Sequence, residues 1–265
     1  MSALVLKLLA SFFMLVDHIG FCFHGPMILR IIGRLAFPIY VFLMTEGFRR
    51  TSNRTRYALR LAIFALVSQV PFGLMIEGVP FQRDLNVLFT LLIGYLSIWL
   101  LETFKHRGGL LVLGLGIILG VQFLFTRDLL HADYGQTGIP LALAFYYLCP
   151  APGKAGDPLS VQSDRRRQSL ILLAACFLAV FSPSLIHYLG QLARAMIGRP
   201  WSISAPNPWS LAQLYSLLAV PLCLLYDGSR GWTPKAKTGR KAFQLAFYAY
   251  YPVHILILVW LKDIL

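Results

Sequence analysis

The sequence predicts an all-α integral membrane protein, a bundle of helices that crosses a bilayer many times. Hydrophobic residues make up 57% of the 265 residues and charged residues 13%, whereas soluble domains carry about 25% charged residues. Apolar runs long enough to cross a bilayer recur along the chain. The four cysteines have no CxxC spacing, so neither a zinc site nor a disulfide framework is expected. This composition excludes a soluble globule and a disordered chain.

Nine apolar runs have a length suited to a membrane-spanning helix, which needs about 20 apolar residues. They cover residues 3–24, 28–48, 57–77, 85–103, 109–126, 134–149, 168–189, 208–226 and 243–262. The sixth run is short, so the expected count ranges from eight to ten. The first run has no small-residue cleavage site after it, which indicates a retained span and not a signal peptide. We expect one transmembrane domain over residues 1–265.

Lysines and arginines gather in every second loop between these runs. Those in the rich loops are Arg49, Arg50, Arg54, Arg56, Arg60, Lys105, Arg107, Lys154, Arg165, Arg166, Arg167, Arg230, Lys235, Lys237, Arg240 and Lys241. The positive-inside rule places these loops and the N-terminus in the cytoplasm and the C-terminus outside. The long connections are then a cytoplasmic loop at 150–168 and an extracytoplasmic loop at 190–208. The net charge of +13 follows from this topology and does not indicate nucleic-acid binding.

Several polar residues lie inside or at the ends of the apolar runs, where an ionisable group is costly and marks a candidate functional site. A helix rises about 1.5 Å per residue, and this spacing puts polar residues from five or six spans at one depth, in the outer half of the membrane. They are Asp17, His18, Arg34, Gln69, Asn86, Tyr134 and His254. We therefore expect these spans to meet around one polar site.

Helix geometry suggests how the charged members of this layer pair. Adjacent residues do not face each other on a helix, so Asp17 is not expected to orient His18. Arg34, at matching depth on the next span, is the better partner for Asp17. That pair is equally well interpreted as a structural clamp between the first two spans and as part of a site. His18 then faces a cavity, with His254 as its companion.

This combination of groups suits acyl transfer. A histidine can remove a proton from an attacking amine or hydroxyl near neutral pH, and a nearby arginine can stabilise a developing oxyanion. The sequence contains no GxSxG elbow, HExxH helix, Walker loop or GxGxxG fingerprint. Serine hydrolases, zincins, nucleotide triphosphatases and Rossmann enzymes therefore lack support, and no metal is expected.

Short motifs in a fixed order resemble the TraX family of membrane acyltransferases. They are Leu15-Val16-Asp17-His18-Ile19-Gly20, Gly33-Arg34-Leu35-Ala36-Phe37-Pro38, Ser68-Gln69-Val70-Pro71-Phe72, Leu85-Asn86-Val87-Leu88-Phe89, Asp133-Tyr134-Gly135, Gly138 and Tyr251-Pro252-Val253-His254. The resemblance implies an enzyme of the bacterial cytoplasmic (inner) membrane similar to the family's pilin-modifying member, which N-acetylates the amino terminus of a conjugative pilin subunit. It implies acetyl-CoA as donor, and a pilin-like peptide amine or an envelope glycan hydroxyl as acceptor.

The roles expected of the site residues follow from this resemblance and from their chemistry. His18 is the predicted general base and His254 a second acid/base or orienting group, while Asp17 and Arg34 position the site or stabilise charge. The predicted substrate-binding residues are Gln69, Asn86 and Tyr134, and the predicted donor-phosphate ligands are Arg49, Arg50 and Arg54. The alternative is a polytopic transporter whose polar pathway is lined by Asp17, His18, Arg34 and His254. The sequence lacks the repeated halves with broken spans that many transporters show.

Overall fold

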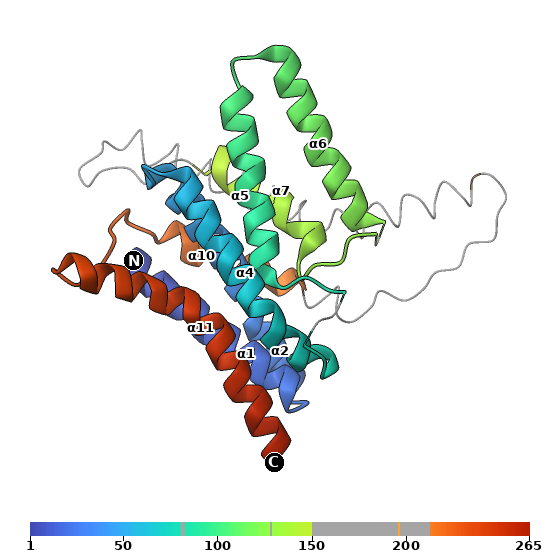
Figure 1. The fold of residues 1–265 in the computed structure, drawn as a ribbon, viewed down its shortest axis with the longest axis vertical. Coiled ribbons are helices and arrows are strands. Elements are labelled where there is room, and N and C mark those ends of the chain that lie inside the picture. The colour runs from blue at the N-terminus through green and yellow to red at the C-terminus, as the bar shows by residue number, and fades with distance from the viewer. Residues whose placement is uncertain (81–82, 128, 150–195, 197–212) are drawn as a thin grey trace.

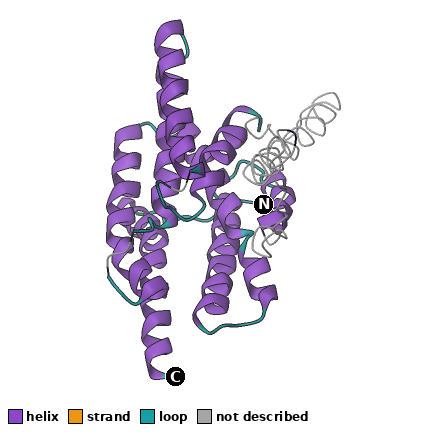
Figure 2. Ribbon diagram, turned by 90° about the vertical axis from the view of Figure 1, so that its right-hand side faces the viewer, coloured by secondary structure: helices purple, strands orange, loops and turns teal. Residues whose placement is uncertain are grey.

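The computed structural model describes residues 1–80, 83–127, 129–149, 196 and 213–265, and the regular elements in them are helices (Figures 1 and 2). In order they are α1 (Ala3–Cys22), α2 (Met27–Gly33), α3 (Ala36–Arg50), α4 (Arg54–Glu77), α5 (Val87–Phe104), α6 (Gly108–Thr126), α7 (Gly135–Tyr147), the 3₁₀ helix η1 (Gln213–Leu218), α10 (Ala219–Leu224) and α11 (Lys237–Ile264). The prediction of an all-α membrane bundle is confirmed.

Six helices within the described residues are long and apolar enough to span a membrane, rather than the nine predicted. They are Ala3–Cys22, Met27–Arg50, Arg54–Glu77, Val87–Phe104, Gly108–Thr126 and Thr238–Ile264. The sixth predicted span corresponds to α7, whose 13 residues reach only about 20 Å, less than the bilayer core of about 30 Å. The predicted span at 208–226 contains the short helices η1 and α10 in its described part. Hydropathy counts apolar residues but does not register where a helix is interrupted.

Three further predictions concern residues outside the part of the chain that the structure describes. These are the span at 168–189, the cytoplasmic loop at 150–168 and, apart from Met196, the extracytoplasmic loop at 190–208.

The helices that carry the polar layer pack around one core. α11 lies against α1 and α4, α3 lies against α1 and α7, and α5 joins α4 to α7. In Figure 1, α1 and α11 run in the same direction, and the turn between α5 and α6 lies at the end opposite the C-terminus. Tyr95 and Phe48 are fully buried between α3 and α5, with ring centroids 5.1 Å apart. α6 stands at the edge of the bundle, beside α5 and α7.

A break in the second span brings the first two spans close together. α2 ends at Gly33, and α3 begins again at Ala36. A Cβ atom on Gly33 would lie 2.2 Å from the Cβ atom of Asp17, far inside a normal carbon–carbon contact. Glycine is therefore required here for α2 to approach α1 at the level of Asp17.

Candidate functional site

His18 on α1 and His254 on α11 form a hydrogen-bonded pair inside the bundle. Both side chains are buried, and His18 Nδ1 lies 2.7 Å from His254 Nε2. The ring planes differ by 6° and the centroids are 4.9 Å apart. This centroid distance is about the N···N distance plus one ring radius on each side, so the rings lie end to end in nearly one plane. That is the geometry of a straight hydrogen bond and not of face-to-face stacking.

The partner of His254 on its other side determines where the protons of the pair lie. His254 Nδ1 is 2.6 Å from the carbonyl oxygen of Tyr250, and a carbonyl only accepts hydrogen bonds. His254 Nδ1 therefore carries a hydrogen, and in the neutral ring Nε2 is left as an acceptor. His18 Nδ1 must then donate to it. The remaining nitrogen of His18, Nε2, keeps its lone pair and has no hydrogen-bond partner among the described residues.

Tyr250 also holds α11 against α1 at this level. Its ring stacks on that of His254 with centroids 4.7 Å apart, and its hydroxyl donates to the carbonyl of Ser11 at 3.1 Å. The carbonyl that fixes the tautomer of His254 is thus itself fixed relative to the helix that carries His18. The pair is preorganised from both sides.

Asp17 on α1 contacts two arginines beside the histidine pair. Arg30 lies within α2, and Arg34 is the residue that caps the C-terminal end of α2. Arg30 Nη1 lies 2.7 Å from Asp17 Oδ2 and Arg34 Nη2 lies 3.7 Å from Asp17 Oδ1. Arg34 Nη1 also donates to the hydroxyl of Tyr134 at 2.9 Å. The structure therefore brings Asp17 and Arg34 together, but the shorter contact is to Arg30, which is not among the predicted site residues. The signal was available, because Arg30 and Arg34 are four residues apart and share one helix face.

Tyr134 is held toward this cluster by an unusual backbone. Its φ of 58° lies in the left-handed region, which non-glycine residues rarely adopt. Its ring stacks on Phe37 with centroids 4.1 Å apart. The preceding loop pairs with the start of α5, where the Asp133 amide donates to the Leu85 carbonyl at 2.9 Å and the Thr90 hydroxyl donates to the Asp133 carbonyl at 2.6 Å.

The Asp133 side chain lies in the connection between α6 and α7, outside the six long helices. Burial raises the pKa of its carboxyl to about 6, and the nearby Arg34 guanidinium opposes this rise. A carboxyl with such a pKa takes up a proton in the mildly acidic range.

Gln69 and Asn86 form a joint between α4 and α5. Asn86 Nδ2 donates to the Ala65 carbonyl at 2.7 Å and to Gln69 Oε1 at 2.9 Å. Gln69 Nε2 donates to the Asp84 carbonyl at 2.7 Å, and Asn86 Oδ1 accepts from the Leu88 amide as the N-cap of α5. These bonds explain both side chains without a ligand. That either one binds a substrate stays a prediction.

The cytoplasmic arginines predicted to hold the donor have partners within the protein. Arg49 pairs with Glu46 at 2.6 Å, and it donates to carbonyls at the end of α7, those of Phe145, Tyr146 and Cys149. Arg50 lies 3.3 Å from Glu46 and donates to the Gly228 carbonyl at 2.7 Å. Arg54 lies over the ring of Phe48. Their role as phosphate ligands likewise stays a prediction.

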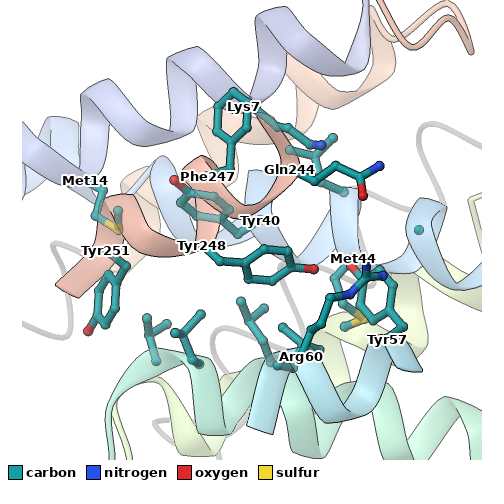
Figure 3. Close-up of a pocket in the computed structure, with 16 residues that line it drawn as sticks. Lys7, Met14, Tyr40, Met44, Tyr57, Arg60, Gln244, Phe247, Tyr248 and Tyr251 are labelled. Atoms are coloured by element: carbon teal, nitrogen blue, oxygen red, sulfur yellow. The ribbon is translucent and has the colours of Figure 1, made fainter. Parts of the chain in front are cut away.

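A cavity of about 220 Å³ lies between α1, α3, α4, α5 and α11 (Figure 3). Its lining includes Lys7 on α1 and Gln244 on α11. Lys7 precedes His18 on α1, and Gln244 precedes His254 on α11, each by a rise of about 16 Å or less along the helix. In the predicted topology, with the N-terminus in the cytoplasm, the cavity therefore lies on the cytoplasmic side of the pair. Tyr251 lines the end of the cavity nearest the histidine pair. Its ring centroid is 6.0 Å from that of His18 and 5.9 Å from that of His254.

The fold and the site define a multi-pass helical membrane protein with a hydrogen-bonded histidine pair in its core. The chain belongs to the TraX family, described as "TraX protein", which matches residues 2–262, so the family predicted from the motifs is confirmed. The chain is also similar to the "Probable fimbrial assembly protein FimC, serogroup H1" of Dichelobacter nodosus. The two are 28% identical over 273 residues, which covers 97% of this chain and 94% of that protein. No solved structure matches the chain.

Proposed function

We propose that the protein is a membrane-embedded acetyltransferase that moves an acetyl group from acetyl-CoA to an amine or hydroxyl, with His18 as general base. The observation that supports this most strongly is the ordered histidine pair. The Tyr250 carbonyl fixes the tautomer of His254, and His254 in turn fixes the tautomer of His18. In a catalytic triad, a third group likewise holds the basic histidine in the tautomer whose free nitrogen can accept a proton.

In the proposed reaction, the acceptor's nitrogen or oxygen attacks the thioester carbonyl carbon while His18 Nε2 takes its proton. The tetrahedral intermediate then collapses, the carbon–sulfur bond breaks, and the leaving sulfur receives that proton from His18. The positive charge that His18 carries in between is stabilised by its Nδ1–H···Nε2 bond to His254, since hydrogen bonds from charged donors are the stronger ones. His254 is thus an orienting group for the base.

Arg34 is the group we assign to the developing oxyanion. It is buried, and its Nε–H has no hydrogen-bond partner among the described residues. Asp17 holds Arg34 and Arg30 in place through its two oxygens, and Asp17 is the neighbour of His18 on α1. A preorganised cation near the reacting carbonyl lowers the barrier of acyl transfer.

The acceptor we favour is the amino terminus of a pilin-like peptide. Its support is the similarity to a protein named as a fimbrial assembly protein, together with the pilin modification that membership of the TraX family implies. The hydroxyl of an envelope glycan is the other acceptor with the required chemistry.

The test uses purified protein in lipid nanodiscs with acetyl-CoA and either a pilin-like peptide with a free amino terminus or an envelope glycan. Release of free CoA thiol measures transfer. We expect His18→Gln to abolish thiol release, and His106→Gln, a change at an exposed histidine in the α5–α6 turn, to leave it unchanged. Near-normal activity of a folded His18→Gln protein would refute the mechanism. Uptake of a solute without thiol release would favour the transporter alternative.

A further inference from the structure

We infer that the cavity between α1, α3, α4, α5 and α11 binds the phosphorylated end and the neutral arm of a nucleotide-type acyl thioester. Lys7 and Arg60 would hold the phosphates, and the thioester would reach the histidine pair past Tyr251. This inference rests on the proposed function and specifies how its donor is bound.

The cytoplasmic end of the cavity carries positive charge without acidic partners. Figure 3 shows the Lys7 amino group beside the Gln244 amide, with the Arg60 guanidinium beside Tyr57. No aspartate or glutamate lines the cavity, and neither cation forms an ion pair within the described part of the chain. Arg60 Nε is buried without a hydrogen-bond partner among those residues.

Aromatic rings hold these two cations in place but do not neutralise them. Lys7 Nζ lies 5.3 Å from the ring centre of Phe247, and the Arg60 guanidinium carbon lies 5.6 Å from that of Tyr57. Cation–π contacts of this kind orient a cation while its charge stays available. In contrast, Arg49 and Arg50 share the carboxylate of Glu46. The missing counter-charge beside Lys7 and Arg60 therefore points to an anionic ligand.

The middle of the cavity suits a narrow, neutral chain. Its walls are formed largely by apolar side chains from five helices, among them Met14, Leu43, Met44, Leu88 and Leu91. Ligand sites of this type bury an uncharged segment against apolar walls and fix its ends with a few polar groups.

The distance between the two ends selects the class of donor. Lys7 and His18 are separated by eleven positions of one helix, or about 16 Å. In acetyl phosphate the acyl group is bonded directly to the phosphate, so one molecule cannot reach both ends. A phosphate joined to a thioester by a pantetheine-type arm can. The phosphate of an anionic phospholipid from the cytoplasmic leaflet offers the same charge, and the test must separate the two.

The experiment compares wild-type protein with Lys7→Gln, Arg60→Gln and the double variant in zwitterionic nanodiscs. The control is Arg56→Gln, which removes an exposed arginine of the same helix as Arg60 that is not part of the cavity lining. Thiol release is measured with acetyl-CoA and with S-acetylpantetheine, which lacks the phosphates. We expect each cavity variant to raise KM for acetyl-CoA about tenfold, with kcat little changed. KM for S-acetylpantetheine should be the same in all the proteins.

Two results would overturn the inference: an unchanged KM for acetyl-CoA in the double variant, or an equal loss with both donors. A third would be thermal stabilisation by phosphatidylglycerol that the double variant loses while its KM for acetyl-CoA stays unchanged, which would assign the cations to a lipid. Calorimetric titration of CoA into His18→Gln separates this inference from the proposed function. We expect that variant to bind CoA normally and to be inactive. If His18→Gln is active, the proposed function fails, and if it is inactive while the cavity variants behave as wild type, only the donor site fails.

Discussion

Replacing His254 by leucine isolates what the second histidine contributes to the base. Leucine fills a similar volume but offers no acceptor to His18 Nδ1, which donates to His254 Nε2 at 2.7 Å. In the proposed reaction His18 takes up a proton, and this bond then becomes a hydrogen bond from a charged donor, a class whose net contribution is about 1.5–3 kcal/mol. If that energy is available only in the transition state, its loss lowers kcat between about tenfold and a hundredfold.

The assay is the initial rate of thiol release at saturating acetyl-CoA, with thermal unfolding measured in parallel to show that the variant folds. His254→Gln is the matched variant, because its amide oxygen can accept the bond from His18, and we expect it to recover part of the lost rate. A kcat for His254→Leu within about twofold of wild type would refute the orienting role. If His254→Gln were as inactive as His18→Gln, His254 would itself transfer a proton, and our assignment of the base would be wrong.

Three further predictions follow from the surroundings of the pair. Gly33→Ala should destabilise the protein by at least about 1–3 kcal/mol and reduce thiol release, because the new Cβ would lie 2.2 Å from Asp17 Cβ; wild-type unfolding and activity would show that α1 and α2 are not packed so closely. Burial raises the pKa of Asp133 to about 6, so the folded state binds this proton more tightly than the unfolded state and loses stability as the pH rises through 6. Asp133→Asn should therefore unfold at a higher temperature than wild type at pH 8, and this advantage should disappear as the pH falls toward 4. The gain in free energy of unfolding at pH 8 should be no more than about 3 kcal/mol. A variant less stable than wild type at every pH would contradict this. Arg49→Gln should lower stability by at least about 1 kcal/mol with KM for acetyl-CoA unchanged, because Arg49 binds Glu46 and the end of α7; a raised KM would instead support its predicted role in donor binding.

Much of the architecture could be predicted from composition and depth along the helices. The helical class, the membrane location and the family are confirmed, and His18 and His254 do meet at one level. Depth is recoverable because a helix advances by a constant rise per residue. Chain order also helped, since the motifs that resemble the TraX family all lie on elements around the site.

What the sequence left undetermined depends on contacts between helices. Arg30 was not among the predicted site residues, because depth along a helix does not show which face a residue occupies, yet it makes the shorter contact to Asp17. Gln69 and Asn86 have polar side chains at the correct depth, but a residue at the start of a helix is equally suited to capping it. Lys7 and Arg60 come from different helices, so nothing in the local sequence of either one indicates the cavity that they share.

The histidine pair joins positions 236 residues apart in the chain, one on the earliest described helix and the other on the last. During synthesis, every intermediate that lacks α11 contains His18 without the neighbour that sets its protonation. If the proposed mechanism holds, the site becomes active only when α11 has been inserted and docked, and a chain truncated before α11 is inactive. Co-expressed halves of the protein, each silent alone, should regain activity only if that last docking step restores the bond.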